Sequence, residues 1–167
     1  MNEQRPLDVY LNDHLAGATA GVELAQQAAT EYGGTDLGSF FVDLVAQIHY
    51  DQVTLEDLMR RVGTRANPIK QAGAWIMEKV TRLKLSGRTG GAPELNLLLT
   101  LETLQLGVEG KRGLWKALKE ITGSHAAIAA FDLDGLIARA ESQIAELEGQ
   151  RLKAAKAALA ATPAGVT

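Results

Sequence analysis

A long amphipathic segment near the amino terminus places the strongest constraint on what this chain can fold into. On a helix that turns about 100° per residue, one side of residues 7–32 is an apolar stripe. The stripe consists of Leu7, Leu11, Ala18, Gly21, Ala25 and Tyr32. The pattern predicts a helix over residues 8–32 that ends at Gly33-Gly34, where left-handed backbone angles cost little. His14 lies near the middle of the stripe, so the sequence places an imidazole in the core.

Four further segments have helical periodicity and recognisable helix ends. They predict helices over residues 35–62, 68–85, 94–121 and 132–161. The starts of these helices include capping residues such as Thr35 or Asp36, Asn67 before Pro68, and Asp132. With no convincing strand, residues 1–167 are expected to form one all-α domain of a size that buries its own core.

The lengths of the segments favour one arrangement of these helices. The helix over residues 68–85 is the shortest, and with the glycine-rich stretch after it, it can carry the chain back along the bundle. The second and fourth helices would then run parallel. Two antiparallel hairpins joined by one long crossover form a ferritin-like four-helix bundle. An up-and-down bundle of five helices is the alternative.

Polar residues interrupt the apolar stripes at matching depths. Asp51 lies in the centre of the second stripe, seventeen residues after Gly34, and His14 lies nineteen residues before Gly33. Because the short turn makes the two helices antiparallel neighbours, the two side chains should lie at nearly the same level. We predict that they meet and that Asp51 accepts a hydrogen bond from the imidazole.

Two basic residues are candidates for the same layer. Lys111 lies at the edge of the fourth stripe near this level, and Arg151 lies near the middle of the last stripe. A buried Asp51 needs such partners because an unpaired charge is costly to remove from water. The layer either fixes the helix register or forms a small site with shifted pKa values. Long basic side chains can also extend outward from apolar stripes, which leaves both assignments open.

Composition excludes several classes of function. The chain has no cysteine, which removes thiolate chemistry and cysteine-based metal sites. No segment approaches the roughly 20 apolar residues of a membrane span, and the start of the chain is not of the signal-peptide type, so we expect a cytoplasmic protein with no membrane partner. We also expect no nucleic-acid partner, because the basic cluster Lys79, Arg82, Lys84 and Arg88 is small. P-loop and dinucleotide-binding motifs are absent from the sequence.

The fourth segment has a second apolar group opposite its main stripe. The group consists of Leu95, Leu99 and Leu106. A helix that is apolar on two sides needs partners on both, and the helix over residues 68–85 or another subunit can supply the second. We therefore expect a homo-oligomer, with a dimer favoured, and keep a different protein partner as a possibility.

The four long segments together resemble a known superfamily. The stretches YLNDHLAGATAGVELAQQA, DLVAQIHYDQVTLEDLMRRVG, LLTLETLQLGVEGKRGLWKAL and LIARAESQIAELEGQRLKAA are similar to a bacterial branch of the ferritin-like superfamily. The resemblance implies a bundle in which active members hold two iron or manganese ions through four glutamates, two of them in Glu-x-x-His pairs. Here the second helix offers Asp51 followed by Thr54, and the last offers Glu141 followed by Ile144. The di-metal ligand set is degenerate.

Two hypotheses of function follow. The first is a non-catalytic ferritin-like bundle without a cofactor, which acts through oligomerisation or partner binding. Its core would contain a group of polar residues, His14, Asp51, Lys111 and Arg151. The second is a divergent metal-dependent oxidoreductase or iron-handling protein that binds iron or manganese at His14, Asp51 and Glu141. A small-ligand pocket beside the glycine-rich helix surfaces is a further alternative.

Overall fold

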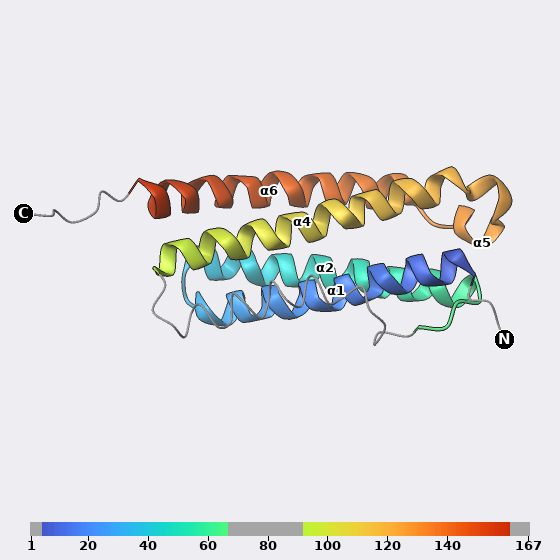
Figure 1. The fold of residues 1–167 in the computed structure, drawn as a ribbon, viewed down its shortest axis with the longest axis horizontal. Coiled ribbons are helices and arrows are strands. Elements are labelled where there is room, and N and C mark those ends of the chain that lie inside the picture. Colours follow the sequence, from blue (N-terminus) through green and yellow to red (C-terminus); the bar gives the residue numbers. More distant parts are fainter. Residues whose placement is uncertain (1–4, 67–91, 161–167) are drawn as a thin grey trace, which may run out of the picture.

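The computed structural model describes residues 5–66 and 92–160, and this part of the chain is all-α (Figure 1). Its four long helices are α1 (Pro6–Glu31), α2 (Asp36–Arg61), α4 (Pro93–Glu120) and α6 (Leu133–Leu159). A 3-10 turn, η1 (Thr122–Ser124), and the short α5 (Ala126–Ala129) connect α4 to α6. Each long helix begins and ends within two residues of the position expected from the sequence. The predicted helix over residues 68–85 and the basic cluster from Lys79 to Arg88 lie outside the described residues.

Local signals account for several of the helix ends. The Thr35 hydroxyl accepts a hydrogen bond from the backbone N–H of Gly38 at 3.0 Å, and the Asp132 carboxylate accepts one from Gly135 at 3.0 Å. Gly34 and Gly63, which follow α1 and α2, have φ angles of 78° and 76°. Both angles are in the left-handed region that glycine adopts without strain. The first hairpin and the end of α2 are therefore specified by nearby residues.

The long helices pack in pairs, α1 against α2 and α4 against α6, and α1 also packs against α4. Figure 1 shows that α1 and α2 are antiparallel and that α4 and α6 are antiparallel as well. In the same view α2 and α4 run in the same direction, so α2 ends at one end of the bundle and α4 begins at the opposite end. The prediction of an all-helical bundle is confirmed.

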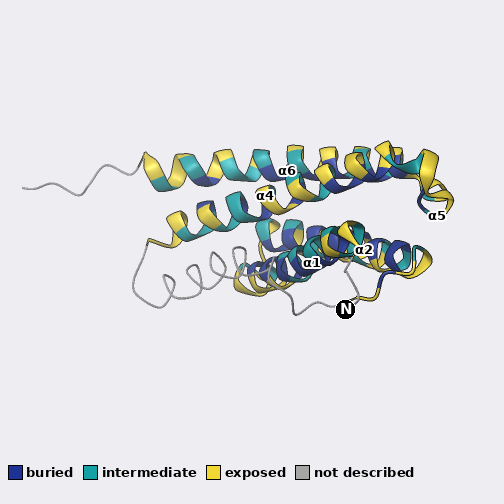
Figure 2. Cartoon of the chain, turned by 45° about the vertical axis from the view of Figure 1, so that its right-hand side comes forward, coloured by how far each residue is buried: buried dark blue, intermediate teal, exposed yellow. Residues whose placement is uncertain are grey.

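The core consists of two apolar clusters along the bundle axis, and the buried faces of the helices turn toward each other (Figure 2). Phe41, Leu101 and Leu147 belong to one cluster, and Leu58 and Trp115 belong to the other. On α2 and α4, a charged residue lies at the boundary between the two clusters. The helices therefore bring polar side chains to one level in the middle of an apolar core.

No helix in the described ranges combines the length and the apolar character that crossing a membrane requires.

Candidate functional site

The carboxylate of Asp51 is the centre of a buried polar cluster. Its side chain is only 1% exposed, and it pairs with cations from two other helices. Lys111 of α4 donates to Oδ2 at 2.6 Å, and Arg139 of α6 donates to Oδ1 at 2.8 Å. Gln143 of α6 donates to Oδ2 at 3.3 Å and accepts from Lys111 Nζ at 2.5 Å. We call these four residues the polar layer.

The polar layer satisfies Asp51 but leaves an excess of positive charge. Two cations share one carboxylate, so the group carries a net charge of +1 (two positive side chains minus one negative). Arg139 reaches the carboxylate from the rim of the bundle, with a 36% exposed side chain and its guanidinium over the Tyr50 ring at 4.5 Å. Lys111 is much more enclosed, at 14% exposure. The excess charge is therefore only partly accessible to water.

Burial has a direct effect on the charge state of the lysine. Desolvation lowers the pKa of Lys111 below its ordinary value of 10.5, although the ion pair and hydrogen bond with Asp51 raise it in part. The nearby Arg139 charge lowers it further. Keeping the Lys111 ammonium charged in the core therefore has a desolvation cost, and a further negative group beside it would reduce that cost.

The predicted hydrogen bond between His14 and Asp51 is not formed. His14 is partly buried on α1, and its ring packs edge-on against Tyr10, with the ring centroids 4.6 Å apart. Burial lowers the pKa of His14 below 6.5, and the nearby Asp13 opposes this shift. Counting residues from the turn located the level of both side chains. It did not determine the direction in which Asp51 points, which is toward Lys111, Arg139 and Gln143.

Arg151 and Glu141 form ion pairs away from the polar layer. Arg151 pairs with Glu148 at 2.7 Å and with Glu102 at 3.5 Å. The half-exposed carboxylate of Glu141 faces Arg112 and Lys116 of α4, at 3.9 and 3.6 Å. Arg151 is therefore a surface residue, not a core partner of Asp51.

The residues proposed as metal ligands do not converge. Within residues 5–66 and 92–160, no three His, Asp or Glu side chains are grouped so that they could hold a metal ion. Both oxygens of Asp51 are bonded to cationic side chains, and Glu141 is paired on the rim. Because iron and manganese require several convergent carboxylate or imidazole ligands, His14, Asp51 and Glu141 do not fit such an ion.

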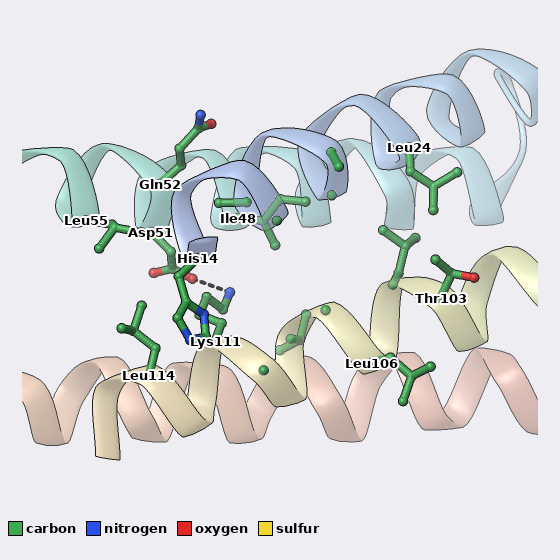
Figure 3. Close-up of a pocket in the computed structure, with 18 of the residues that line it drawn as sticks. His14, Leu24, Ile48, Asp51, Gln52, Leu55, Thr103, Leu106, Lys111 and Leu114 are labelled. Atoms are coloured by element: carbon green, nitrogen blue, oxygen red, sulfur yellow. Dashed lines mark hydrogen bonds and ion pairs between the residues drawn. The ribbon is translucent and has the colours of Figure 1, made fainter. Parts of the chain in front are cut away.

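A cavity of about 310 Å³ lies beside the polar layer, between α1, α2 and α4. Small residues of α1 and α4, among them Gly17, Gly21, Gly107 and Gly110, form much of its wall. Figure 3 shows His14, Asp51 and Lys111 gathered at one end, while Leu24, Thr103 and Leu106 lie toward the other. The cavity therefore has a polar end and an apolar body.

One buried polar atom at the cavity has no partner. Trp115 lines the cavity and is fully buried, yet its indole Nε1 has no hydrogen-bond acceptor among the described residues. Buried indole N–H groups usually find an acceptor, and an unmade bond costs about 1–3 kcal/mol. Because Nε1 has almost no accessible surface, it is an unpaired donor within the core and not a group that a molecule in the cavity could reach.

Sequence reasoning missed Arg139 and Gln143, and it included a small-ligand pocket beside the glycine-rich helix surfaces only as an alternative without naming its polar end. A signal for Gln143 was present, because it lies three residues after Ala140 and four before Leu147, in the spacing of the buried residues of α6. Arg139 had no such signal, since it lies beside the stripe and reaches Asp51 through the length of its side chain. The cavity depends on the distance between helices, which no single segment encodes.

Comparison with known proteins yields no match: no protein-family model, no curated protein and no solved structure is similar to this chain at a significant level.

Proposed function

We propose that this chain is a non-catalytic, ferritin-like helical bundle that acts by associating with a second copy of itself through the outer face of α4. The parallel course of α2 and α4, between two antiparallel pairs, supports the ferritin-like arrangement (Figure 1). The polar layer supports a non-catalytic role, because Lys111 and Arg139 occupy the carboxylate that would otherwise bind a metal.

The observation that carries the proposal is a row of exposed leucines on α4. Leu95, Leu99 and Leu106 are 39%, 39% and 49% exposed, and their spacing of four and seven residues places them on one side of the helix. Scattered apolar residues are common on protein surfaces, but a continuous row on one helix is typical of an interface. In a two-fold dimer each leucine contributes twice, so a short row supplies a substantial apolar contact.

The test is the molar mass in solution, measured by light scattering after size-exclusion chromatography. We expect a dimer for the native chain and a monomer for the Leu99→Glu variant, with a melting temperature close to that of the native protein. The matched control is Val53→Glu, which places the same charge at a 49% exposed position on α2, outside the row of leucines on α4. This variant should remain a dimer.

Two results would overturn the proposal. One is a native chain that stays monomeric at the highest attainable concentration. The other is a Leu99→Glu variant that melts several degrees lower with no change in molar mass. That second result would show that part of the same chain covers the leucines, so that they belong to the core of the monomer.

A further inference from the structure

The cavity between α1, α2 and α4 combines features that a binding site for a small molecule requires. At about 310 Å³ it lies at the lower end of the range for small-molecule sites, which is roughly 300–1,000 Å³. Its wall is mostly apolar, and His14, Asp51 and Lys111 lie together at one end, with the Thr103 hydroxyl toward the other (Figure 3). Pockets of this kind hold the body of a ligand by burial and orient it through a few polar contacts.

The polar end offers hydrogen-bond donors that the described residues do not use. Lys111 uses two of its three N–H donors, for Asp51 and Gln143. The described part of the chain gives the imidazole of His14 no hydrogen bond, and its ring contacts only the Tyr10 ring edge-on. An ammonium with an unused donor and an imidazole therefore lie at the same end of the cavity (Figure 3).

Charge decides which ligand head group suits this end. The polar layer carries one more positive than negative charge, and within the described residues no second carboxylate pairs with Lys111 or Arg139. Asp13 also lines the cavity, but its charge acts on His14 and not on Lys111. An anionic oxygen at Lys111 would offset part of the desolvation cost of the ammonium. A cationic head group would be repelled, and a neutral one would leave the excess charge uncompensated.

The volume sets the size of the ligand. A water-sized group takes up about 30 Å³, so the cavity holds on the order of ten non-hydrogen atoms. A straight-chain carboxylic acid of about eight carbons has this size. Its alkyl chain would pass Gly21, Gly107 and Gly110. A Cβ atom added at any of these three glycines would have no atom within 4 Å, so there is open space beside them.

We infer that this cavity binds a medium-chain monocarboxylate, with the carboxylate at Lys111 and the alkyl chain along the small-residue faces of α1 and α4. Leu106 belongs both to the wall of this cavity and to the row of leucines proposed for self-association, whereas the polar end of the cavity lies among buried residues of the bundle. The site also assigns a role to the excess charge of the polar layer.

The experiment uses the fluorescence of Trp115 in the full chain with Trp75→Phe, which removes the only other tryptophan. Octanoate is the probe, and octan-1-ol and octylammonium, with the same alkyl chain, are the comparison ligands. We expect saturable changes in Trp115 emission with octanoate, at least tenfold weaker binding of octan-1-ol, and no saturable binding of octylammonium.

Two variants locate the site. Gly107→Leu should fill the cavity without touching the polar layer, and we expect at least a tenfold loss of octanoate affinity with no loss of thermal stability. Gly149→Leu is the matched control, because Gly149 is exposed on α6 and also has open space around it. It should bind octanoate as the native chain does.

The inference is overturned by any of three results. The first is no saturable response to octanoate, and the second is octan-1-ol binding as tightly as octanoate. The third is equal octanoate affinity in the Gly107→Leu and native chains, which would place binding elsewhere on the protein. None of these readouts depends on the molar mass, so failure of the dimer and failure of this site are distinguishable.

Discussion

Helix α4 packs against both α6 and α1, and it does so in very different ways. Toward α6 it forms close apolar contacts together with ion pairs such as Lys116–Glu141 and Arg151–Glu102. Toward α1 the described residues form no ion pair, and the small residues of both helices leave a cavity of about 310 Å³. The same helix is thus tightly packed on one side and open on the other.

The difference shows that small residues do not by themselves bring helices together. Glycines on facing helices permit a close approach, but the spacing between helices is set by the largest side chains at the contact. Here Trp115 and Leu114 of α4 and Leu24 of α1 are among the residues around the cavity. The small residues next to them therefore face open space instead of each other.

The largest expected effect concerns the polar layer, which joins α2 to α4 and α6 at the end of the cavity. Replacing Asp51 with Ala leaves Lys111 and Arg139 in the core without a carboxylate, and the free energy of unfolding should fall by about 3–5 kcal/mol. Urea denaturation measures the loss. The control is Asp57→Ala, which removes surface pairs with Arg60 and Arg61 and should cost less than about 1 kcal/mol. Equal losses in the two variants would mean that the polar layer does not hold α2 to α4 and α6.

A smaller effect of opposite sign should appear on the open side. Gly107→Ala places a methyl group where no atom lies within 4 Å, so the higher helix propensity of alanine should stabilise the chain by about 1 kcal/mol. Gly149→Ala on the exposed surface of α6 should give a similar gain. Thermal or urea denaturation measures the stability of both variants relative to the native chain. If Gly107→Ala destabilises the protein while Gly149→Ala stabilises it, α1 lies closer to α4 than the cavity implies.

The smallest expected effect is a pH dependence that originates at His14. Because burial lowers its folded pKa below 6.5, the unfolded chain binds this proton at a higher pH than the folded chain does. The free energy of unfolding should therefore fall as the pH drops below about 6.5, until the folded imidazole is protonated too. His14→Phe should remove this contribution to the pH dependence of the free energy of unfolding. His49→Gln, at an exposed position on α2, should retain it. If the free energy of unfolding of His14→Phe depends on pH as that of the native chain does, the imidazole is open to solvent.

Much of the fold could be predicted from the sequence because helix formation here depends on local signals. The apolar periodicity, the caps at Thr35 and Asp132 and the glycine turns each involve residues close together in the chain. They were sufficient to predict an all-helical chain and the ends of its long helices. They also placed Asp51 and Lys111 near one level, since rise per residue is constant along a helix.

Which side chains at that level bond to one another depended on tertiary structure. Rise per residue determines depth, but the rotation of each helix and the length of each side chain decide which groups meet. For that reason Asp51 bonds to Arg139 and Gln143 and not to His14, and Arg151 pairs on the surface. The cavity is likewise a property of three helices at once. The sequence alone determined the helices and the level of their polar residues, and only the packed bundle decided which charges are paired and where space is left.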